Sequence, residues 1–292
     1  MFKEKAEKIF AKNYKILMAI PIIITIIAVI FIGVKYQQTG DLFNKDVSLR
    51  GGIAATVYTA NLLTEEQIKS SLQVDATVRT ISEVTSGKQL GFIVEVSDLN
   101  RDQLKERLQN LGLELTSQNY SVEETGERLG QAFYRQLLFA IGLAFLLMGI
   151  TIFITFRTIA PSLAVIFAAF MNLTVTIAIV NLLGMNVSTA GIAGLLLIIG
   201  YSIDTDVLLT TWVLKKKEYG SLFQRMFHSM QTGLTMTLCA IGVMLVGLLV
   251  SNSIVIKEMF TIIFIALIVD IFATYLTNTG ILWHYCKRKN IT

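Results

Sequence analysis

The sequence predicts a polytopic α-helical membrane protein with six transmembrane helices and a small α+β domain outside the membrane. Hydrophobic residues make up 53% of the 292 residues and charged residues only 16%, a balance that excludes a soluble globular protein of this length. Six apolar stretches are long enough to cross a hydrocarbon core about 30 Å thick. They are residues 16–34, 136–156, 162–183, 187–212, 233–250 and 260–285.

These stretches divide the chain into three parts. Residues 1–34 contain the N-terminus and the first span, residues 35–135 form a polar segment, and residues 136–292 contain the other spans and the C-terminus. The first span is expected to be retained, because it is too long for a signal-peptide core and lacks a small-residue cleavage site.

Basic residues predict that both termini lie in the cytoplasm of a cell-membrane protein. Lysines precede the first span, Arg157 follows the second, and residues 215–217 and 287–289 are basic. The loops on the other side contain one basic residue, Lys257. By the positive-inside rule the polar segment is extracytoplasmic. The net charge of +4 follows from this topology and gives no support to nucleic-acid binding.

The polar segment predicts a small α+β domain. Strands are expected at residues 47–58, 76–85, 90–97 and 113–122, with a turn at 86–89 joining the second to the third. A capping box at 64–67 predicts a helix to residue 72, and a second helix over 98–111 ends before Gly112. The order β-α-β-β-α-β is that of the ferredoxin-like split βαβ fold, and residues 123–135 form an amphipathic lead-in to the second span.

Two aspartates, Asp204 and Asp206, interrupt the fourth span. A carboxylate at bilayer depth costs about 2.5–3.5 kcal/mol on insertion scales, which favours a functional role. Because Asp204 and Asp206 are two residues apart on a helix, their side chains diverge by about 200° and cannot share one pocket. Asp204 is deeper and lies on a stripe with Gly200, so we expect Asp204 to be the working group. Asp206 is expected to be a helper near the interface, or simply a solvated helix end.

The sixth and third spans add polar groups at the same depth. Asp270 begins a stripe that continues through Thr274, Thr277 and Asn278 at helical spacing, and Asn172 lies in the third span. Together these side chains are expected to line a buried polar path for a proton or an ion. The alternative for Asp270 is a structural hydrogen bond that holds two helices together. Two cysteines without a Cys-x-x-Cys pattern and two histidines predict no metal site and no cofactor.

Four segments, in order along the chain, carry a resemblance to a known family. Leu49-Arg50-Gly51-Gly52 resembles the double-glycine motif of the SecD and SecF protein-export membrane proteins. The segment from Gly200 to Asp206, Gly-Tyr-Ser-Ile-Asp-Thr-Asp, is similar to the fourth-span motif of the SecF family in its archaeal form. Residues 153–157 and 274–277 resemble the family's second-span and sixth-span motifs. The resemblance covers nearly the full chain, and the small outside domain matches the SecF branch.

This resemblance implies an auxiliary subunit of the Sec translocon, related to resistance-nodulation-division transporters. Its implied partners are SecD, the SecY channel, the preprotein and the lipid bilayer, with proton flow coupled to export. Asp204 matches the family's acidic position in the fourth span. The third-span His-Asp pair of bacterial members is replaced by Met171-Asn172, and Asp270 is the candidate replacement. Arg50, Gly51 and Gly52 form either a hinge at the domain junction or an ordinary turn.

Three other functions remain open at this point. A small-molecule exporter half would share the superfamily, although the short polar segment leaves little room for a substrate cleft. An intramembrane aspartyl protease would pair Asp204 with Asp270, but its companion motifs are absent, so no enzyme activity is expected. A passive scaffold predicts that Asp204→Asn exports normally, whereas a coupling role predicts normal assembly with impaired export.

Overall fold

The computed structural model describes residues 2–59, 61, 63–82, 88–251 and 253–291, which form two compact units. The helical unit contains the residues up to Asn44, the segment Phe139–Met185 and the residues from Ala190 onward. The sheet unit contains Lys45–Leu138 together with the short segment Asn186–Thr189. The sheet unit therefore draws on two separate parts of the chain.

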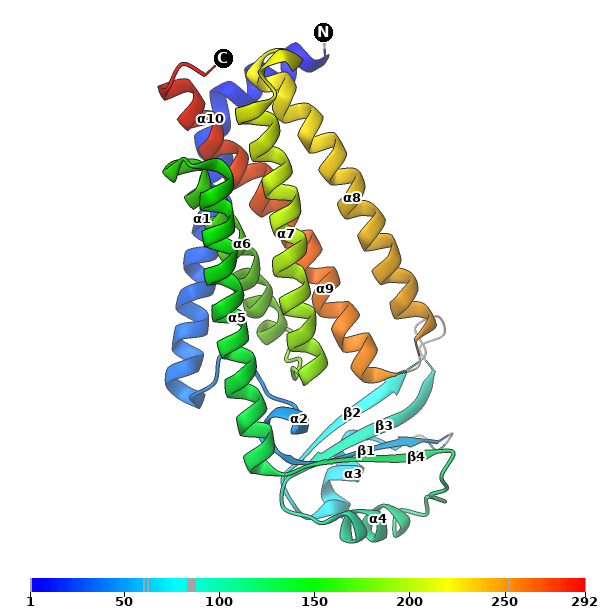
Figure 1. Ribbon diagram of the computed structural model, residues 1–292. Coiled ribbons are helices and arrows are strands. Elements are labelled where there is room, and N and C mark those ends of the chain that lie inside the picture. Colours follow the sequence, from blue (N-terminus) through cyan, green and yellow to red (C-terminus); the bar gives the residue numbers. More distant parts are fainter. Residues whose placement is uncertain (1, 60, 62, 83–87, 252, 292) are drawn as a thin grey trace. The chain divides into compact units, whose positions relative to one another are not determined.

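Six helices in the described part of the chain are long and apolar enough to cross a membrane, as the sequence predicts. Figure 1 shows those of the helical unit running along a common direction. They are α1 (Phe2–Thr39), α5 (Glu127–Phe156), α6 (Ile159–Leu182), α7 (Thr189–Lys215), α8 (Leu222–Val250), and a sixth span that begins with α9 (Ile254–Phe272) and ends with α10 (Thr279–Arg288).

Several helices extend beyond their apolar stretches. The boundaries expected after residues 34 and 135 fall inside α1 and α5, because each helix continues into polar sequence. The lead-in expected at 123–135 is divided between a strand and the first turns of α5. Helix α8 begins well before residue 233, since Ser221 and Gln224 form a capping box at its start. Apolar length thus locates a span, whereas capping chemistry sets its ends.

The sixth span is not a uniform α-helix. Between α9 and α10 the chain forms a π-helical segment, Ala273–Asn278. There the Thr279 hydroxyl donates to the Thr274 carbonyl at 3.1 Å, a contact five residues back along the chain. Widened π turns are rare and often occur at functional sites, because they redirect the side chains that follow. The polar residues predicted on this span lie in and just before this segment.

The sheet unit contains one antiparallel sheet with the strand order β2-β3-β1-β4. On the central strand β1, Ala55 lies opposite Val94 of β3 and Val122 of β4. In chain order the elements are α2 (Val47–Arg50), β1 (Gly52–Tyr58), α3 (Glu65–Leu72), β2 (Ala76–Ser82), β3 (Gln89–Val96), α4 (Arg101–Gln109) and β4 (Tyr120–Thr125).

Helices α3 and α4 cover one face of this sheet (Figure 1). Ile68 and Leu72 of α3 and Leu104 and Leu108 of α4 are buried against alternate residues of the strands, such as Val94. The period-two alternation of the strands and the helical spacing of the leucines therefore meet in one apolar core. Capping boxes start both helices, at Thr64 as the sequence predicts and also at Asn100.

Two of the strand predictions need correction. Residues 47–50, expected to begin a strand, form helix α2 because the Asp46 side chain caps the Val47 N–H. The last strand begins at Tyr120 and not at residue 113. The preceding residues form a turn in which the Asn119 side chain bonds the backbone of Glu114 and Thr116. The turn expected at 86–89 lies partly outside the described residues.

Candidate functional site

Two carboxylates are buried inside the helical unit. Asp206 of α7 and Asp270 of α9 each have 0% of their surface exposed. The Asp270 carboxylate accepts hydrogen bonds from the Ser202 hydroxyl, from Thr205 Oγ1 at 3.2 Å and from Asn172 Nδ2 at 3.2 Å. Since Ser202 and Thr205 belong to α7 and Asn172 to α6, one carboxylate joins three membrane-spanning helices.

The second carboxylate is held by the π-helical segment. Asp206 Oδ1 accepts a hydrogen bond from Asn278 Nδ2 at 2.8 Å. Asp206 Oδ2 is buried without a hydrogen-bond partner among the described residues, and so is Asn278 Oδ1. Thr274 is fully buried and lies close enough to interact with both Asp206 and Asp270. Within the described residues, the Thr274 hydroxyl is thus the side-chain group nearest to completing the hydrogen bonding of Asp206.

Within the described ranges the hydrogen-bond donors to these two carboxylates are Ser, Thr and Asn side chains, and none of them is basic. Two ionised carboxylates that interact inside one buried site would repel each other, and burial disfavours each charge further. Hydrogen bonds from Ser, Thr and Asn compensate only part of that cost. Such an arrangement favours the binding and release of a cation, and the smallest candidate is a proton. The described chain gathers no group of three or more His, Cys, Asp or Glu side chains able to hold a metal ion.

The two fourth-span aspartates differ in burial, and the burial of Asp206 rules out a solvated helix end for that residue. Asp206 is enclosed and Asp204 is exposed on the outer surface of α7. The two side chains diverge as expected, and two glycines of α7 lie in different surroundings. Gly194 packs against Met259 and Ile263 of α9, whereas the space around Gly200 is open. The face of α7 opposite Gly200 and Asp204 therefore meets the rest of the helical unit.

The polar residues singled out on the third and sixth spans are buried in the helical unit. Asn172, Asp270, Thr274, Thr277 and Asn278 are all buried. Asn172 contacts Asp270 directly, and a Thr176 hydroxyl donates to Asn172 Oδ1 at 3.4 Å. A facing pair of Asp204 and Asp270, which an aspartyl protease would need, is not formed because Asp204 points outward.

The two hydroxyl donors on α7 were not among the predicted site residues. Ser202 and Thr205 lie three positions apart, on one helix face, within the motif that contains both aspartates. Their spacing identifies them as neighbours on one helix face. The sequence does not show that they contact Asp270, because Asp270 lies on a different span.

Comparison with known sequences places this site in a family. The family described as "Protein export membrane protein SecD/SecF, C-terminal" matches residues 103–288. "Protein-export membrane protein SecF" of Pyrococcus furiosus is 30% identical over 292 residues, which cover 99% of this chain and 97% of the relative. The protein of the same name from Methanocaldococcus jannaschii is 33% identical, over 94% of this chain and 96% of the relative. The chain belongs to the SecF family.

Solved structures show the same fold for the SecF-family chain. SecDF from Thermus thermophilus, a translocon-associated membrane protein, matches with a TM-score of 0.74 at 20% identity. The match covers 96% of this chain but 38% of the SecDF chain. The super-membrane-facing form of SecDF matches with a TM-score of 0.62, over 97% of this chain and 39% of that one. The SecF-family chain thus spans well under half of the SecDF chain.

The double-glycine motif of this SecF-family chain lies where three segments of the sheet unit meet. Gly51 has φ +88° and Gly52 has φ +126°, values that side chains rarely permit. A Cβ atom on Gly51 would collide with the backbone of Glu127, the first residue of α5. A Cβ atom on Gly130 would lie 2.9 Å from the Gly51 nitrogen. Close packing of α5 on the α2–β1 connection therefore accounts for Gly51, whereas a Cβ atom on Gly52 would lie 2.6 Å from the Val96 carbonyl oxygen of β3.

Arg50 of the same motif pairs with a buried glutamate. Arg50 Nη2 lies 3.4 Å from Glu95 Oε2, and Arg79 of β2 pairs with the other carboxylate oxygen. Glu95 lies on β3, one of the two inner strands, and its side chain is 0% exposed. Burial, and then the nearby Asp46, raise the pKa of Glu95 above its ordinary value, and the two arginines offset this only in part.

The raised pKa of Glu95 predicts that the sheet unit loses stability as pH rises. The folded unit binds the proton more tightly than the unfolded chain, so folding is favoured while Glu95 is protonated. Between the ordinary pKa of 4.5 and the raised one, the free energy of unfolding should therefore fall. Glu95→Gln should remove this slope. Hydrogen exchange of the β3 amides in the detergent-solubilised chain, corrected for intrinsic rates, measures it. Equal slopes in the two proteins would contradict the prediction.

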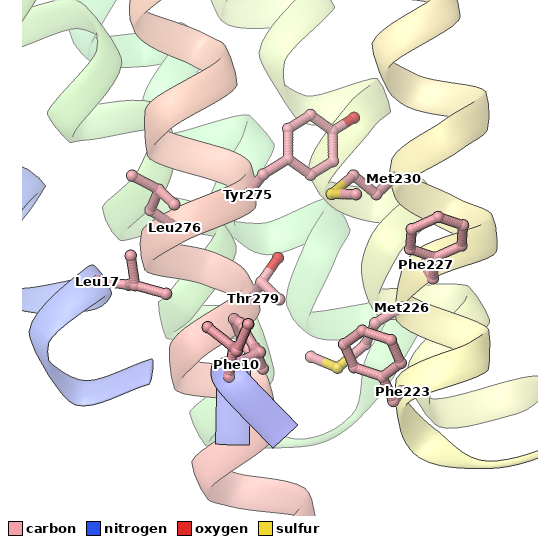
Figure 2. A pocket seen from close by; sticks show the side chains of 10 residues that line it. Phe10, Leu17, Phe223, Met226, Phe227, Met230, Tyr275, Leu276 and Thr279 are labelled. Carbon is pink, nitrogen blue, oxygen red and sulfur yellow. The ribbon is translucent and has the colours of Figure 1, made fainter. Parts of the chain in front are cut away.

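The helical unit also contains an apolar cavity of about 380 Å³, apart from the carboxylates (Figure 2). Phe10 of α1, Met226 and Phe227 of α8 and Leu276 of the π-helical segment line it. Tyr275, adjacent to Thr274 in the sequence, also borders this cavity. The sixth span therefore borders both the carboxylate site, with Asp270 and Asn278, and the cavity, with Leu276 and Thr279.

Proposed function

We propose that this chain pairs with a SecD-type subunit beside the SecY channel and couples preprotein export to the proton gradient. The buried pair of Asp206 and Asp270 carries the proposal, because no basic partner is present among the described residues. Gaining or losing one proton in such a site changes the electrostatic free energy by enough to bias helix packing between two states. Asp270 contacts α6 and α7, so those helices would respond first.

The proposed topology places both termini in the cytoplasm and the sheet unit outside. The lysines before α1 and those after α7 and α10 support this orientation through the positive-inside rule. The strand order β2-β3-β1-β4, with helices after β1 and β3, supports assignment of the sheet to the ferredoxin-like class.

The proposed pairing face includes the exposed side of α7. Ala193, Leu197, Gly200 and Asp204 recur every three or four residues there and are all exposed. A carboxylate facing hydrocarbon is costly, and a partner helix that approaches closely at Gly200 would cover Asp204. The match to SecDF covers only 38% of that longer chain. The remaining residues of SecDF support the proposal that a second membrane-spanning subunit is this partner. We propose that Asp204 acts together with the buried pair once it is covered.

Gly200→Leu tests the pairing face. No atom lies within 4 Å of a Cβ placed at Gly200, so the chain itself should fold normally. The added side chain would keep a partner helix away, and co-purification of the SecD-type subunit should fall by about tenfold or more. Gly142→Leu is the matched control, since the space beside Gly142 on α5 is also open. Equal recovery of the partner with both variants would exclude this face.

The coupling itself is tested in vesicles that contain the chain, its SecD-type partner and the channel. Export of a preprotein is measured with the proton gradient intact and with the gradient collapsed. A chain that couples export to protons should raise the export rate in the first condition, and variants of the buried carboxylates should remove only that increase.

A further inference from the structure

The apolar cavity of the helical unit opens between α1 and α8 (Figure 2). Helix α1 packs on α6 and on the π-helical segment, whereas α8 packs mainly on α9. The two helices approach each other at Phe10 and Phe223, whose ring centroids lie 6.3 Å apart. Tyr275 and Thr279, which also line the cavity, are buried, whereas Ile9 is 62% exposed. The cavity therefore extends from the sixth span to the outer surface of the helical unit.

The cavity is lined by the first half of α1 and of α8, before most of their apolar residues. All its residues on α8 and most of those on α1 precede the apolar stretches that begin at residues 233 and 16. The cavity is therefore expected at the depth where lipid headgroups meet hydrocarbon. Water finds few hydrogen-bonding partners in an apolar cavity, and an unfilled cavity leaves its walls without contacts. A hydrocarbon chain from the adjoining leaflet would fill the cavity without either cost.

Basic side chains border the cavity on α1. Lys8, Lys12 and Lys15 are all exposed, and no acidic residue lies between them. Their spacing of four and three residues places them on one face of the helix. That face is next to the one that carries Ile9, because successive residues of a helix are about 100° apart. Lysine clusters beside a membrane-spanning segment attract anionic lipid headgroups. The cavity thus combines an apolar interior with a cationic margin.

We infer that this cavity binds a hydrocarbon chain of an anionic lipid, with the headgroup against Lys8, Lys12 and Lys15. Its volume of about 380 Å³ falls within the range of about 300–1,000 Å³ found for small-molecule sites. The lysines favour a lipid over an apolar side chain from a partner subunit, because a lipid carries negative charge and a hydrocarbon chain in one molecule. A bound chain would contact both α1 and α8 and hold them together. Asp206 and Asp270 do not line this cavity, so the inference does not depend on proton coupling.

Met230→Trp tests the cavity in the full, detergent-solubilised chain. Met230 lines the cavity, so the larger side chain would occupy the space of a lipid chain. After incubation with phosphatidylglycerol, native mass spectrometry measures the lipid that the protein retains. Each methylene group displaced from an apolar site weakens binding by about fourfold, so retention should fall by about tenfold or more. Met236 is exposed on the same helix and does not line the cavity, so Met236→Trp is the matched control and should retain lipid like the wild type.

The triple variant Lys8→Gln, Lys12→Gln and Lys15→Gln tests the headgroup. Each lysine near an anionic membrane surface strengthens binding by about fivefold. The wild type should therefore retain phosphatidylglycerol about tenfold or more better than phosphatidylcholine of the same chain length. The triple variant should retain the two lipids equally. Equal retention of both lipids by the wild type would contradict the assignment of an anionic lipid.

A brominated lipid chain provides a measurement that leaves the cavity unaltered. In Trp212→Phe the remaining tryptophan is Trp283, which is buried and contacts Phe10 with ring centroids 5.4 Å apart. Bromine quenches tryptophan fluorescence only at short range, so brominated phosphatidylglycerol should quench Trp283 from inside the cavity. The inference is overturned if Met230→Trp and Met236→Trp retain equal lipid, or if Trp283 is not quenched. Release of the lipid when the SecD-type subunit assembles would also overturn it, and would assign the cavity to a side chain of that subunit.

Discussion

Asp270→Asn is expected to abolish the part of preprotein export that depends on the proton gradient. The amide keeps the volume of the carboxylate, and the hydroxyls of Ser202 and Thr205 can rotate to accept its hydrogen bonds. The helices should therefore stay packed. The amide cannot gain or lose a proton, however, so the site can no longer exist in two charge states. Export in vesicles with an intact gradient should fall to the rate that the wild-type chain shows when the gradient is collapsed.

Thr25→Val is the matched control for this experiment. Thr25 is buried in α1, outside the predicted polar path, and its hydroxyl donates to the Pro21 carbonyl of its own helix at 2.8 Å. The valine variant should export like the wild type. Full gradient dependence in Asp270→Asn would show that the carboxylate only holds α6, α7 and α9 together, which is the scaffold hypothesis.

Gly51→Ala is expected to cause a large loss of stability in the sheet unit. At φ +88° and ψ 158° a side chain is strained, and the new Cβ would overlap the backbone of Glu127. Backbone strain of this kind and overpacking each cost about 1–3 kcal/mol, so a loss of about 3 kcal/mol is expected. The start of α5 would have to move, and protection of the β1 amides against hydrogen exchange should fall accordingly.

Gly126→Ala is the control that separates the steric overlap at Gly51 from the general cost of replacing a glycine by alanine. Gly126 lies immediately before α5, but no atom is within 4 Å of a Cβ placed there and its φ is not positive. The protection of β1 should be nearly unchanged in this variant. If the two variants lose equal protection, close packing at Gly51 is not the reason for the motif.

Capping side chains decide where helices begin, even where the pattern of β-branched residues predicts a strand. Residues 47–58 are rich enough in β-branched side chains to predict a strand, but the Asp46 cap and the positive φ of Gly51 turn the first four of them into a helix. Thr64 shows the opposite case, because the capping box that its sequence predicts is formed. A local motif with its own hydrogen bonds is more reliable than composition, since its partners are a few residues away.

The sequence by itself determined the six spans, the polar segment after the first, and the set of polar residues in the third, fourth and sixth spans. Apolar length and the cost of a charge in hydrocarbon decide these features, and both depend on the residues alone. Only the tertiary structure decided that Asp206 faces inward and Asp204 outward, and that Ser202 and Thr205 bond Asp270. A helix apolar on every side has no preferred face of its own, so its neighbours fix its rotation. Packing of Gly194 on α9 does this for α7.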